Sequence, residues 1–222
     1  MKKIFFLVFI TIALAACSKS NDDSANVPET DYQLSADGLT LVKWLNPLTS
    51  GINMQADSRL REVNTIGEKA FKDCSRLQSV IFPDNLKEIN TEAFAGTDLR
   101  TSVVFNSYSD VVFGERVFSN TRITSITLPK TKELSAEIFA NCTALKNITF
   151  AKTGKIGRGA FKGCTAIEQI DLSQAEAIAI GAETFAGCKR LKKVILSVTM
   201  NLKPIGDKAF ANCESLENLT VL

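Results

Sequence analysis

Residues 156–172 read IGRGAFKGCTAIEQIDL, and variants of this pattern return over residues 64–222. Each variant is centred on a phenylalanine. The seven phenylalanines are separated by 23, 24, 21, 22, 24 and 25 positions, and they are Phe71, Phe94, Phe118, Phe139, Phe161, Phe185 and Phe210. Periods of about 20 to 50 residues are typical of stacked repeat proteins. The spacing therefore predicts seven units, each about 23 residues long.

A short strand is expected after each phenylalanine. Apolar residues follow it at five or six positions and then alternate, as in Ile167, Ile170 and Leu172. Alternation with period two indicates a strand with one buried face. The second unit is irregular, because residues 99–105 (LRTSVVF) permit two registers, and the sequence does not choose between them.

A short helical turn is expected around each phenylalanine. The residue four positions before it is of a type favoured or tolerated at a helix N-cap: Gly67, Asn90, Gly114, Ser135, Gly157, Gly181 or Gly206. The residue two positions after it accepts the left-handed conformation that ends a helix: Asp73, Gly96, Asn120, Asn141, Gly163, Gly187 or Asn212. Both ends of one turn are therefore predicted in every unit.

The apolar positions of successive units can be buried only by stacking. With strands about 4.8 Å apart, they would form continuous columns, with the seven phenylalanine rings as the central spine. We therefore predict an α+β repeat solenoid, with one short strand and one short helical turn per unit, over residues 63–222. Residues 31–62, which contain Trp44 and the hairpin-turn signal Asp37-Gly38, are expected to form an N-terminal cap.

The pattern Ile-Gly-x-x-Ala-Phe-x-x-Cys-x-x-Leu-x-x-Ile-x-Leu resembles the BspA-like leucine-rich-repeat family over residues 64–222. The resemblance implies a surface lipoprotein that binds host or microbial macromolecules. Units two and three depart from the pattern, because Thr97 and Thr121 replace the cysteine and one residue is missing after each. This departure is expected to alter a loop without breaking the stack.

The N-terminus reads as a processing signal. Lys2 and Lys3 precede an apolar run, and residues 14–17 (LAAC) resemble a bacterial lipobox. The resemblance implies a signal peptide over residues 1–16 and a lipid anchor on Cys17, followed by a flexible tether over residues 17–30. An outer-membrane lipoprotein exposed at the cell surface is expected. The acidic residues 22–23 are similar to a surface-export signal of some anaerobes, although a solvated linker explains them equally well.

Composition argues against several functions. Removing residues 1–16 takes away Lys2 and Lys3 from the 26 basic residues, which leaves 24 against 24 acidic residues and a net charge of zero. Nucleic acid is therefore an unexpected partner, because phosphate binding needs a basic surplus. The chain has no histidine, the commonest general base and metal ligand. We expect no catalytic site, no metal and no cofactor.

Five cysteines besides Cys17 recur three positions after a phenylalanine: Cys74, Cys142, Cys164, Cys188 and Cys213. Equivalent positions on stacked units point their side chains in parallel, which disfavours disulfides. A zinc site would need a CxxC pair or a histidine. We therefore predict buried free thiols.

The outward residues of the strands form the candidate binding face. They are Ser79, Ile81, Ser125, Thr127, Asn147, Thr149, Gln169, Asp171, Lys193, Ile195, Asn218 and Thr220, and the second unit is expected to add Val103. This polar, nearly neutral face suits an extended contact with a protein or glycan. A strand preference of threonine and isoleucine explains the composition equally well.

Three functions were compared. The anchor, the tether and the repeated face favour a surface adhesion or recognition protein. Trp44 is expected in the core of the cap, where it would not serve as a ligand-stacking platform. The bare strand at residues 221–222 leaves a protected edge or end-to-end self-association, which would suit a structural envelope protein. Catalysis is disfavoured, because the nearby carboxylates Glu168 and Asp171 lack an oriented nucleophile.

Overall fold

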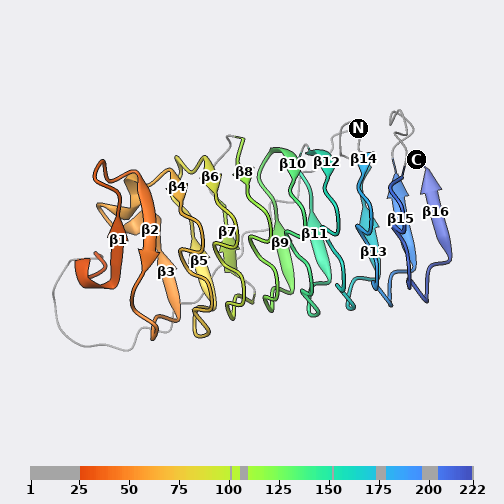
Figure 1. Ribbon diagram of the computed structural model, residues 1–222, viewed down its shortest axis with the longest axis horizontal. Coiled ribbons are helices and arrows are strands. Elements are labelled where there is room, and N and C mark those ends of the chain that lie inside the picture. The colour runs from red at the N-terminus through yellow and green to blue at the C-terminus, as the bar shows by residue number, and fades with distance from the viewer. Residues whose placement is uncertain are drawn as a thin grey trace, which may run out of the picture.

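The computed structural model of the chain describes residues 26–100, 102–105, 110–151, 153–173, 179–196 and 205–221. These residues coil into an elongated solenoid of stacked rungs, with strands on successive rungs lying side by side (Figure 1). The signal peptide and Cys17 lie outside the described residues. The predicted solenoid is confirmed.

Two rows of strands run along the solenoid. The first row precedes the phenylalanines and contains β2 (Thr40–Trp44), β4 (Thr65–Ile66), β6 (Glu88–Ile89), β8 (Val112–Phe113), β10 (Thr131–Leu134), β12 (Thr153–Ile156) and β14 (Ala179–Ile180). The second row follows them and contains β3 (Gly51–Asn53), β5 (Ser79–Ile81), β7 (Ser102–Val104), β9 (Ser125–Thr127), β11 (Asn147–Thr149), β13 (Gln169–Asp171), β15 (Lys193–Leu196) and β16 (Asn218–Val221). The sequence had indicated the second row alone.

Within each row, most strands pair in parallel with the equivalent strand of a neighbouring rung. Among the described residues, the pairing is interrupted between β8 and β10 in the first row, and between β7 and β9 and between β11 and β13 in the second row. Ile66 pairs with Ile89 in the first row, and Val80 pairs with Val103 in the second. This pairing fixes the register of the second unit. Val103 is buried, because the alternation along β7 turns it inward, so the expectation that it belongs to the open face is wrong.

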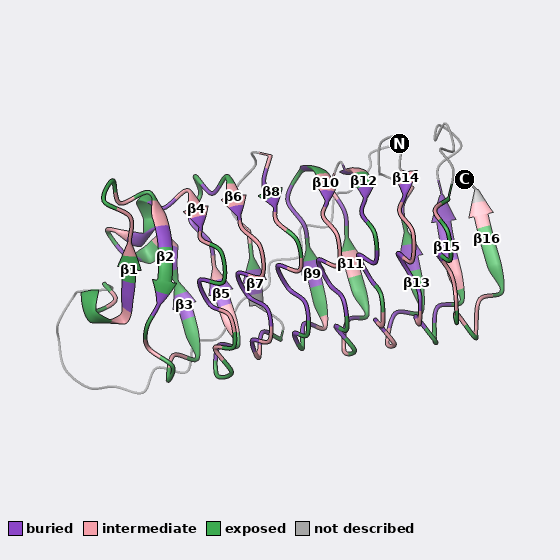
Figure 2. Cartoon of the chain, in the orientation of Figure 1, coloured by how far each residue is buried: buried purple, intermediate pink, exposed green. Residues whose placement is uncertain are grey.

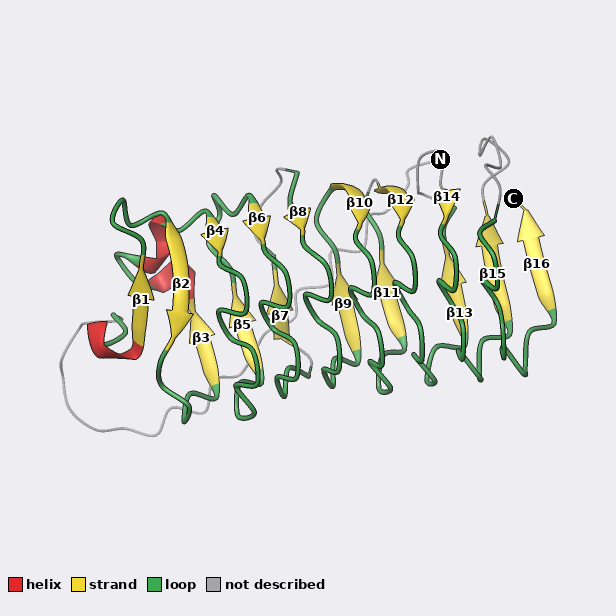
Figure 3. Cartoon of the chain, in the orientation of Figure 1, coloured by secondary structure: helices red, strands yellow, loops and turns green. Residues whose placement is uncertain are grey.

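Helices are scarce in the described residues, and the three that form are short 3-10 helices at the N-terminal end (Figure 3). They are η1 (Glu29–Asp31), η2 (Met54–Ala56) and η3 (Leu60–Glu62). The helical turn expected around each phenylalanine is not found. A succession of turns occupies these segments instead, which we call the Phe turns: residues 67–74, 90–97, 114–121, 135–142, 157–164, 181–188 and 206–213.

Hydrogen bonds in the Phe turns alternate between two directions. The amides of Lys69, Phe71 and Asp73 donate to carbonyls of the next rung, at distances of 2.7 to 3.0 Å. The amides of Ala70, Lys72 and Cys74 donate to the residue three positions earlier in the same rung. The same scheme returns in the following units. Each Phe turn is therefore tied to its neighbour like a strand, and a helix would lack these bonds because it directs its amides along its own axis.

Left-handed backbone conformations make this alternation possible. All seven residues two positions after a phenylalanine have positive φ, from 57° at Asn120 to 75° at Gly187. The sequence had predicted this conformation but attached it to a helix end. Residues two positions before the phenylalanine are also left-handed, including Lys69, Glu92 and Arg116, and residue type gives no sign of it there.

Glycine occurs at the positions that resembled helix N-caps for a different reason. A Cβ atom on Gly206 would lie 2.3 Å from the backbone nitrogen of Ala182, and one on Gly114 would lie 2.4 Å from that of Thr91. Both neighbours belong to the preceding rung. Glycine is therefore required because the two backbones approach closely, not because a helix begins.

The seven phenylalanine rings lie in one continuous stack. Successive ring centroids are 4.7 to 5.6 Å apart, with interplanar angles of 5° to 19°. Every ring except that of Phe210 belongs to a residue with no exposed surface. Figure 2 shows buried stretches on the rungs up to β15, whereas residues 218–220 of β16 are exposed or intermediate.

Two aromatic residues of the N-terminal segment extend this stack. Trp44 lies 5.4 Å from Phe71, and Tyr32, from β1 (Tyr32–Leu34), lies 6.0 Å from Trp44. Trp44 is 4% exposed, so its face is not available as a ligand platform. β1 pairs with β2 in antiparallel fashion through a turn at Gly38, where φ is +73°, as the hairpin prediction required.

The buried carboxylate of Asp57 ties the start of the described chain to the first rungs. Its oxygens accept hydrogen bonds from the backbone amides of Val27 at 2.6 Å and of Arg59 and Leu60 at 2.8 Å. Arg59 Nη2 also donates to the carbonyl of Val27 at 2.9 Å. Residues 26–30, at the end of the segment expected to be a tether, are therefore held against the solenoid.

We predict that Phe139→Ala lowers the free energy of unfolding by about 3 to 5 kcal/mol, because it removes a fully buried ring from between two stacked rings. Phe210→Ala is the matched control. Its loss should be clearly smaller, because Phe210 is half-buried and stacks on Phe185. Urea denaturation followed by circular dichroism measures both. Equal losses, or a Phe139→Ala loss below about 1 kcal/mol, would contradict the stack's role.

Candidate binding surface

The outward residues of the second row lie on strands of three sheets, β3-β5-β7, β9-β11 and β13-β15-β16. Within each sheet, strand pairing aligns equivalent residues. Ser125 lies opposite Asn147, and Thr127 lies opposite Thr149. In the last sheet one line passes through Gln169, Lys193 and Asn218, and the other through Asp171, Ile195 and Thr220. The residues of the sequence-predicted face therefore lie on successive strands of one row.

Exposure is greatest in the middle of this surface. The exposed residues on the three central strands are Ser125, Thr127, Asn147, Thr149, Gln169 and Asp171, and we call them the central polar face. Figure 2 shows the exposed stretches on β9 and β11. Toward the ends, Ser79, Ile81, Lys193 and Thr220 are half-buried, while Asn218 is exposed.

Ile195 does not belong to the open surface. Only 6% of the residue is exposed, although it occupies an outward position on β15. β15 is the middle strand of its three-stranded sheet, and Ile195 lies between Asp171 and Thr220. Neighbours on both sides cover its aliphatic side chain, so its assignment to the binding face is wrong.

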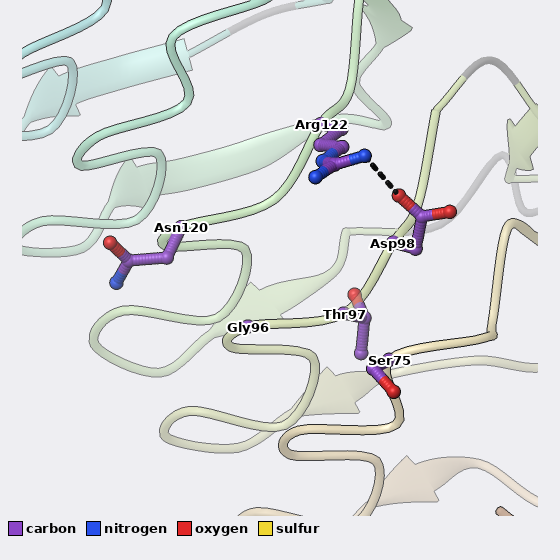
Figure 4. Close-up of a pocket in the computed structure, with 6 residues that line it drawn as sticks. All are labelled: Ser75, Gly96, Thr97, Asp98, Asn120 and Arg122. Carbon is purple, nitrogen blue, oxygen red and sulfur yellow. Dashed lines mark ion pairs between the residues drawn. The ribbon is translucent and has the colours of Figure 1, made fainter.

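A polar hollow of about 300 Å³ lies where units two and three are shorter than the others (Figure 4). Its lining residues are Ser75, Gly96, Thr97, Asp98, Asn120 and Arg122. The chain takes five positions from Phe94 to Leu99 and from Phe118 to Ile123, whereas it takes six from Phe71 to Leu77. The altered loop predicted from the sequence is present, and the phenylalanine stack runs past it unbroken.

Asp98 is the electrostatic centre of the hollow. Its Oδ2 accepts hydrogen bonds from Arg100 Nε at 3.1 Å and Nη2 at 2.9 Å. Its Oδ1 is buried, accepts no hydrogen bond, and lies 3.5 Å from Arg122 Nη1. The Asp98 side chain is 13% exposed, whereas that of Arg122 is 70% exposed. One acid therefore faces two guanidinium groups, and these three side chains together carry a charge of +1.

A ladder of thiol and hydroxyl groups lies beside the ring stack. Cys142, Cys164 and Cys188 are fully buried, and their Sγ atoms donate to the phenylalanine carbonyl of the preceding rung at 3.0 to 3.2 Å. In the shortened units, Thr97 and Thr121 donate instead to the phenylalanine carbonyl of their own rung. The cysteines are free, as predicted, but Cys74 and Cys213 are half-buried.

Burial raises the pKa values of these thiols and so makes them weaker acids than an exposed cysteine. It raises the pKa of Cys142 to about 11, although the hydroxyl of Thr121 opposes the shift, and it raises the pKa of Cys188 to about 12. The pKa of Cys164 is raised well above its ordinary value for the same reason. Because the thiolate is the reactive form, these positions are chemically inert at neutral pH.

A family model described as the BspA type leucine rich repeat region matches residues 52–130 and 111–222, with six copies. The chain belongs to this family. A second match, to the prokaryotic membrane lipoprotein lipid attachment site, covers residues 1–18 and includes Cys17. This BspA-type repeat protein is therefore a membrane-anchored bacterial lipoprotein.

Three solved structures are similar to this BspA-type protein. A leucine-rich repeat protein from Bacteroides ovatus is 20% identical, with 83% of this chain and 79% of that chain covered and a TM-score of 0.45. The leucine-rich repeat protein of T. pallidum is 18% identical, with 87% of this chain and 91% of that chain covered and a TM-score of 0.44. A leucine-rich cell surface protein from Faecalibacterium prausnitzii is 16% identical, with coverages of 90% and 95% and a TM-score of 0.37.

No curated protein matches the sequence. Within the described part of the BspA-type chain, no helix has the length and apolar character needed to cross a membrane. The same residues contain no group of three or more acidic, cysteine or histidine side chains arranged to hold a metal ion.

We predict that the buried thiols of this BspA-type protein make its stability fall at alkaline pH. A pKa raised in the folded state leaves stability fully present below about pH 9 and removes it as pH rises toward the folded value. For Cys142 alone the loss should reach about 2 kcal/mol near pH 10.5. Urea denaturation at several pH values measures this loss.

Cys142→Ala is the matched control, and it should show a shallower alkaline decline than the unmodified protein. Ellman's reagent should label Cys142, Cys164 and Cys188 at pH 8 only after urea is added. Rapid labelling of all thiols in the folded protein, or identical pH slopes for both proteins, would show that these thiols are accessible.

Proposed function

We propose that this protein binds a macromolecular ligand, a protein or a glycan, at the bacterial cell surface through the second row of the solenoid. In this proposal Cys17 carries the lipid anchor in the outer membrane, and the residues that follow it form a tether. The cap over residues 31–62 and the solenoid over residues 63–222 then project from the membrane. The match to a lipoprotein attachment site supports the anchor.

The observation that carries the proposal is the exposure of the central polar face. Its six residues lie on three successive strands, β9, β11 and β13, and none of them is a large apolar residue. This surface consists mainly of hydroxyl and amide groups, which contribute nothing to the packing of the core. It offers donors and acceptors repeated at about 4.8 Å, the spacing of stacked strands.

Such a surface suits an extended partner. None of its residues lines the hollow around Asp98, and an open row of strand side chains does not enclose a small substrate, because ligand pockets bury most of the ligand's surface. A repeated set of hydrogen-bonding groups can instead engage successive units of a polymer or a strand-like segment. Asp171 is the one charged member of the central polar face, and this excludes the basic surplus that nucleic acid would need.

The lowered pKa of Glu168, a carboxylate near this surface, disfavours catalysis. Glu168 is exposed and contacts both Lys192 and Arg190. The hydrogen bond from Lys192, reinforced by the charges of Lys192 and Arg190, holds the pKa of Glu168 below its ordinary value. A general acid working near neutral pH needs a raised pKa, so Glu168 is poorly suited to donate a proton.

An alternative function is a structural envelope protein that contacts other copies of itself. The exposed apolar residues Ile205 and Leu219 in the last described rung favour it, with 44% and 51% of their surfaces exposed. Size-exclusion chromatography with light scattering distinguishes the two functions. Monomers at high concentration would support the binding protein, and concentration-dependent oligomers lost in Leu219→Ser would support the envelope protein.

We predict that Lys193→Glu combined with Gln169→Glu weakens ligand binding at least fivefold, because both residues lie in one line of the second row. The probe is a panel of immobilised extracellular-matrix proteins and mucin, with binding measured by surface plasmon resonance. Lys132→Glu is the control, because it makes the same charge change as Lys193→Glu on an exposed residue of the first row. Equal affinity of the double variant and the unmodified protein would move the contact to another surface.

We also predict that protease added to intact cells removes the solenoid from the anchor. Cleavage should occur in the segment after Cys17, because a protein at the cell surface presents it to the medium. Immunoblotting with a periplasmic protein as the control measures this. A chain that stays intact while cells are whole, and is cut once they are lysed, would place the protein on the periplasmic side.

A further inference from the structure

We propose that the polar hollow of units two and three is a second binding site, and that it takes an anionic sugar residue of a glycan. The site goes beyond the proposed function, because none of its lining residues belongs to the central polar face. Its volume lies at the small end of the range for ligand pockets, which suits a single sugar residue of a chain that continues outside.

The hollow arises from a local change in the repeat. In full-length units, two residues lie between the cysteine and the next apolar position, as Thr143 and Ala144 do between Cys142 and Leu145. In units two and three a single residue, Asp98 or Arg122, takes the place of these two. Two neighbouring rungs are shortened at the same point, so their loops leave a depression beside the longer loop that carries Ser75.

The shortening also brings a charged residue to each of these two loops. Asp98 and Arg122 are the equivalent residues of consecutive rungs, and Figure 4 shows the guanidinium group of Arg122 directed at Asp98. Their separation of 3.5 Å exceeds the usual length of a hydrogen bond between these groups. Asp98 therefore orients Arg122 but leaves its N–H groups available to a ligand.

The charge balance favours an anion. Arg100 already donates two hydrogen bonds to Asp98 Oδ2, so the second guanidinium, that of Arg122, is in excess. A guanidinium group binds a carboxylate or sulfate through paired N–H donors, and this interaction is strong where water is partly excluded. The 70% exposure of the Arg122 side chain leaves these donors open to solvent.

The remaining lining residues favour a sugar over an acidic peptide. Ser75 supplies a hydroxyl group and Asn120 supplies an amide group, whereas the hydroxyl of Thr97 is already bonded to the carbonyl of Phe94. Asn120 Oδ1 accepts a hydrogen bond from the side-chain Nδ2 of Asn141 at 3.4 Å. The N–H donors of the Asn120 side chain are left for a ligand oxygen. Large apolar side chains, which a peptide side chain would pack against, do not occur among these lining residues.

A second hollow on the solenoid shows why charge alone is not enough. Glu133, Lys155 and Arg158 contribute to its lining, but Lys155 donates to Glu133 at 2.7 Å and Arg158 donates to Glu183 at 2.9 Å. Both cations there are hydrogen-bonded to carboxylates. Arg122 differs because its carboxylate partner is already engaged by Arg100.

The test measures binding of three polysaccharides by isothermal titration calorimetry: polygalacturonate, which carries carboxylates, dextran sulfate and neutral dextran. We expect polygalacturonate or dextran sulfate to bind, dextran not to bind, and the affinity to fall as salt is raised. The two charged polymers separate a carboxylate from a sulfate as the recognised group. Polyglutamate serves as the acidic peptide. Binding of polyglutamate alone, or of no anionic polymer, would overturn the proposal.

Two variants locate the site. Arg122→Gln should weaken binding at least tenfold, whereas Arg190→Gln, at another exposed arginine, should leave it unchanged. Insertion of one alanine between Thr121 and Arg122 restores the length of the other units and should fill the hollow. It should abolish binding while keeping the midpoint of thermal unfolding within a few degrees, because full-length units already occur in the same stack.

The double variant Lys193→Glu with Gln169→Glu separates this site from the central polar face. It should bind the anionic polysaccharide with unchanged affinity, even if the proposed function of that face fails. Loss of binding in this double variant but not in Arg122→Gln would place the anion on the second row and overturn the proposal. Equal binding by the unmodified protein, Arg122→Gln and the insertion variant would overturn it as well.

Discussion

The rest of the structure depends on the contact between each phenylalanine ring and the ring of the next rung. Successive rings stack at 5.5 Å along much of the solenoid, which is within the range for favourable aromatic pairs. The backbone amide of each of these residues also bonds to the following rung. A single residue type therefore supplies both the apolar interior and the hydrogen bonds that hold consecutive rungs together.

This arrangement explains why the surface can vary while the fold does not. The side chains that point outward from the second row take no part in the stack, so the central polar face can change its chemistry without cost to the core. The shortened loops of units two and three show the same independence, because the rings of Phe94 and Phe118 stay aligned across them. The residues of the proposed binding surface are therefore positions that the spine leaves free.

The sequence predicted the features that depend on residue type at a fixed period. These include the stack of rings, the left-handed conformation after each phenylalanine, and the burial of Trp44 and of the central cysteines. It failed where two structures use the same residues. Glycine before the phenylalanine and asparagine after it suit a capped helix and a chain of turns alike, and only the close approach of Gly206 to Ala182 distinguishes them. The left-handed Lys69 gave no signal, because lysine has no preference for that conformation.

The candidate site was predicted in part. The alternation of the strands placed Asn147 and Thr149 outward, but it could not show that the neighbours of Ile195 cover it. The missing residue in units two and three predicted an altered loop. The pairing of Asp98 with two arginines could not be predicted from the sequence, because it depends on which residues of consecutive rungs become neighbours.

Native-state hydrogen exchange of the phenylalanine amides tests the shared interior most directly. If the rungs support one another, protection should be highest for Phe118 and Phe139 in the middle of the stack and should decline toward Phe185, because each rung is stabilised by its neighbours on both sides. Protection that is uniform along the chain, or lowest at the middle rungs, would contradict an interior held together by contacts between rungs.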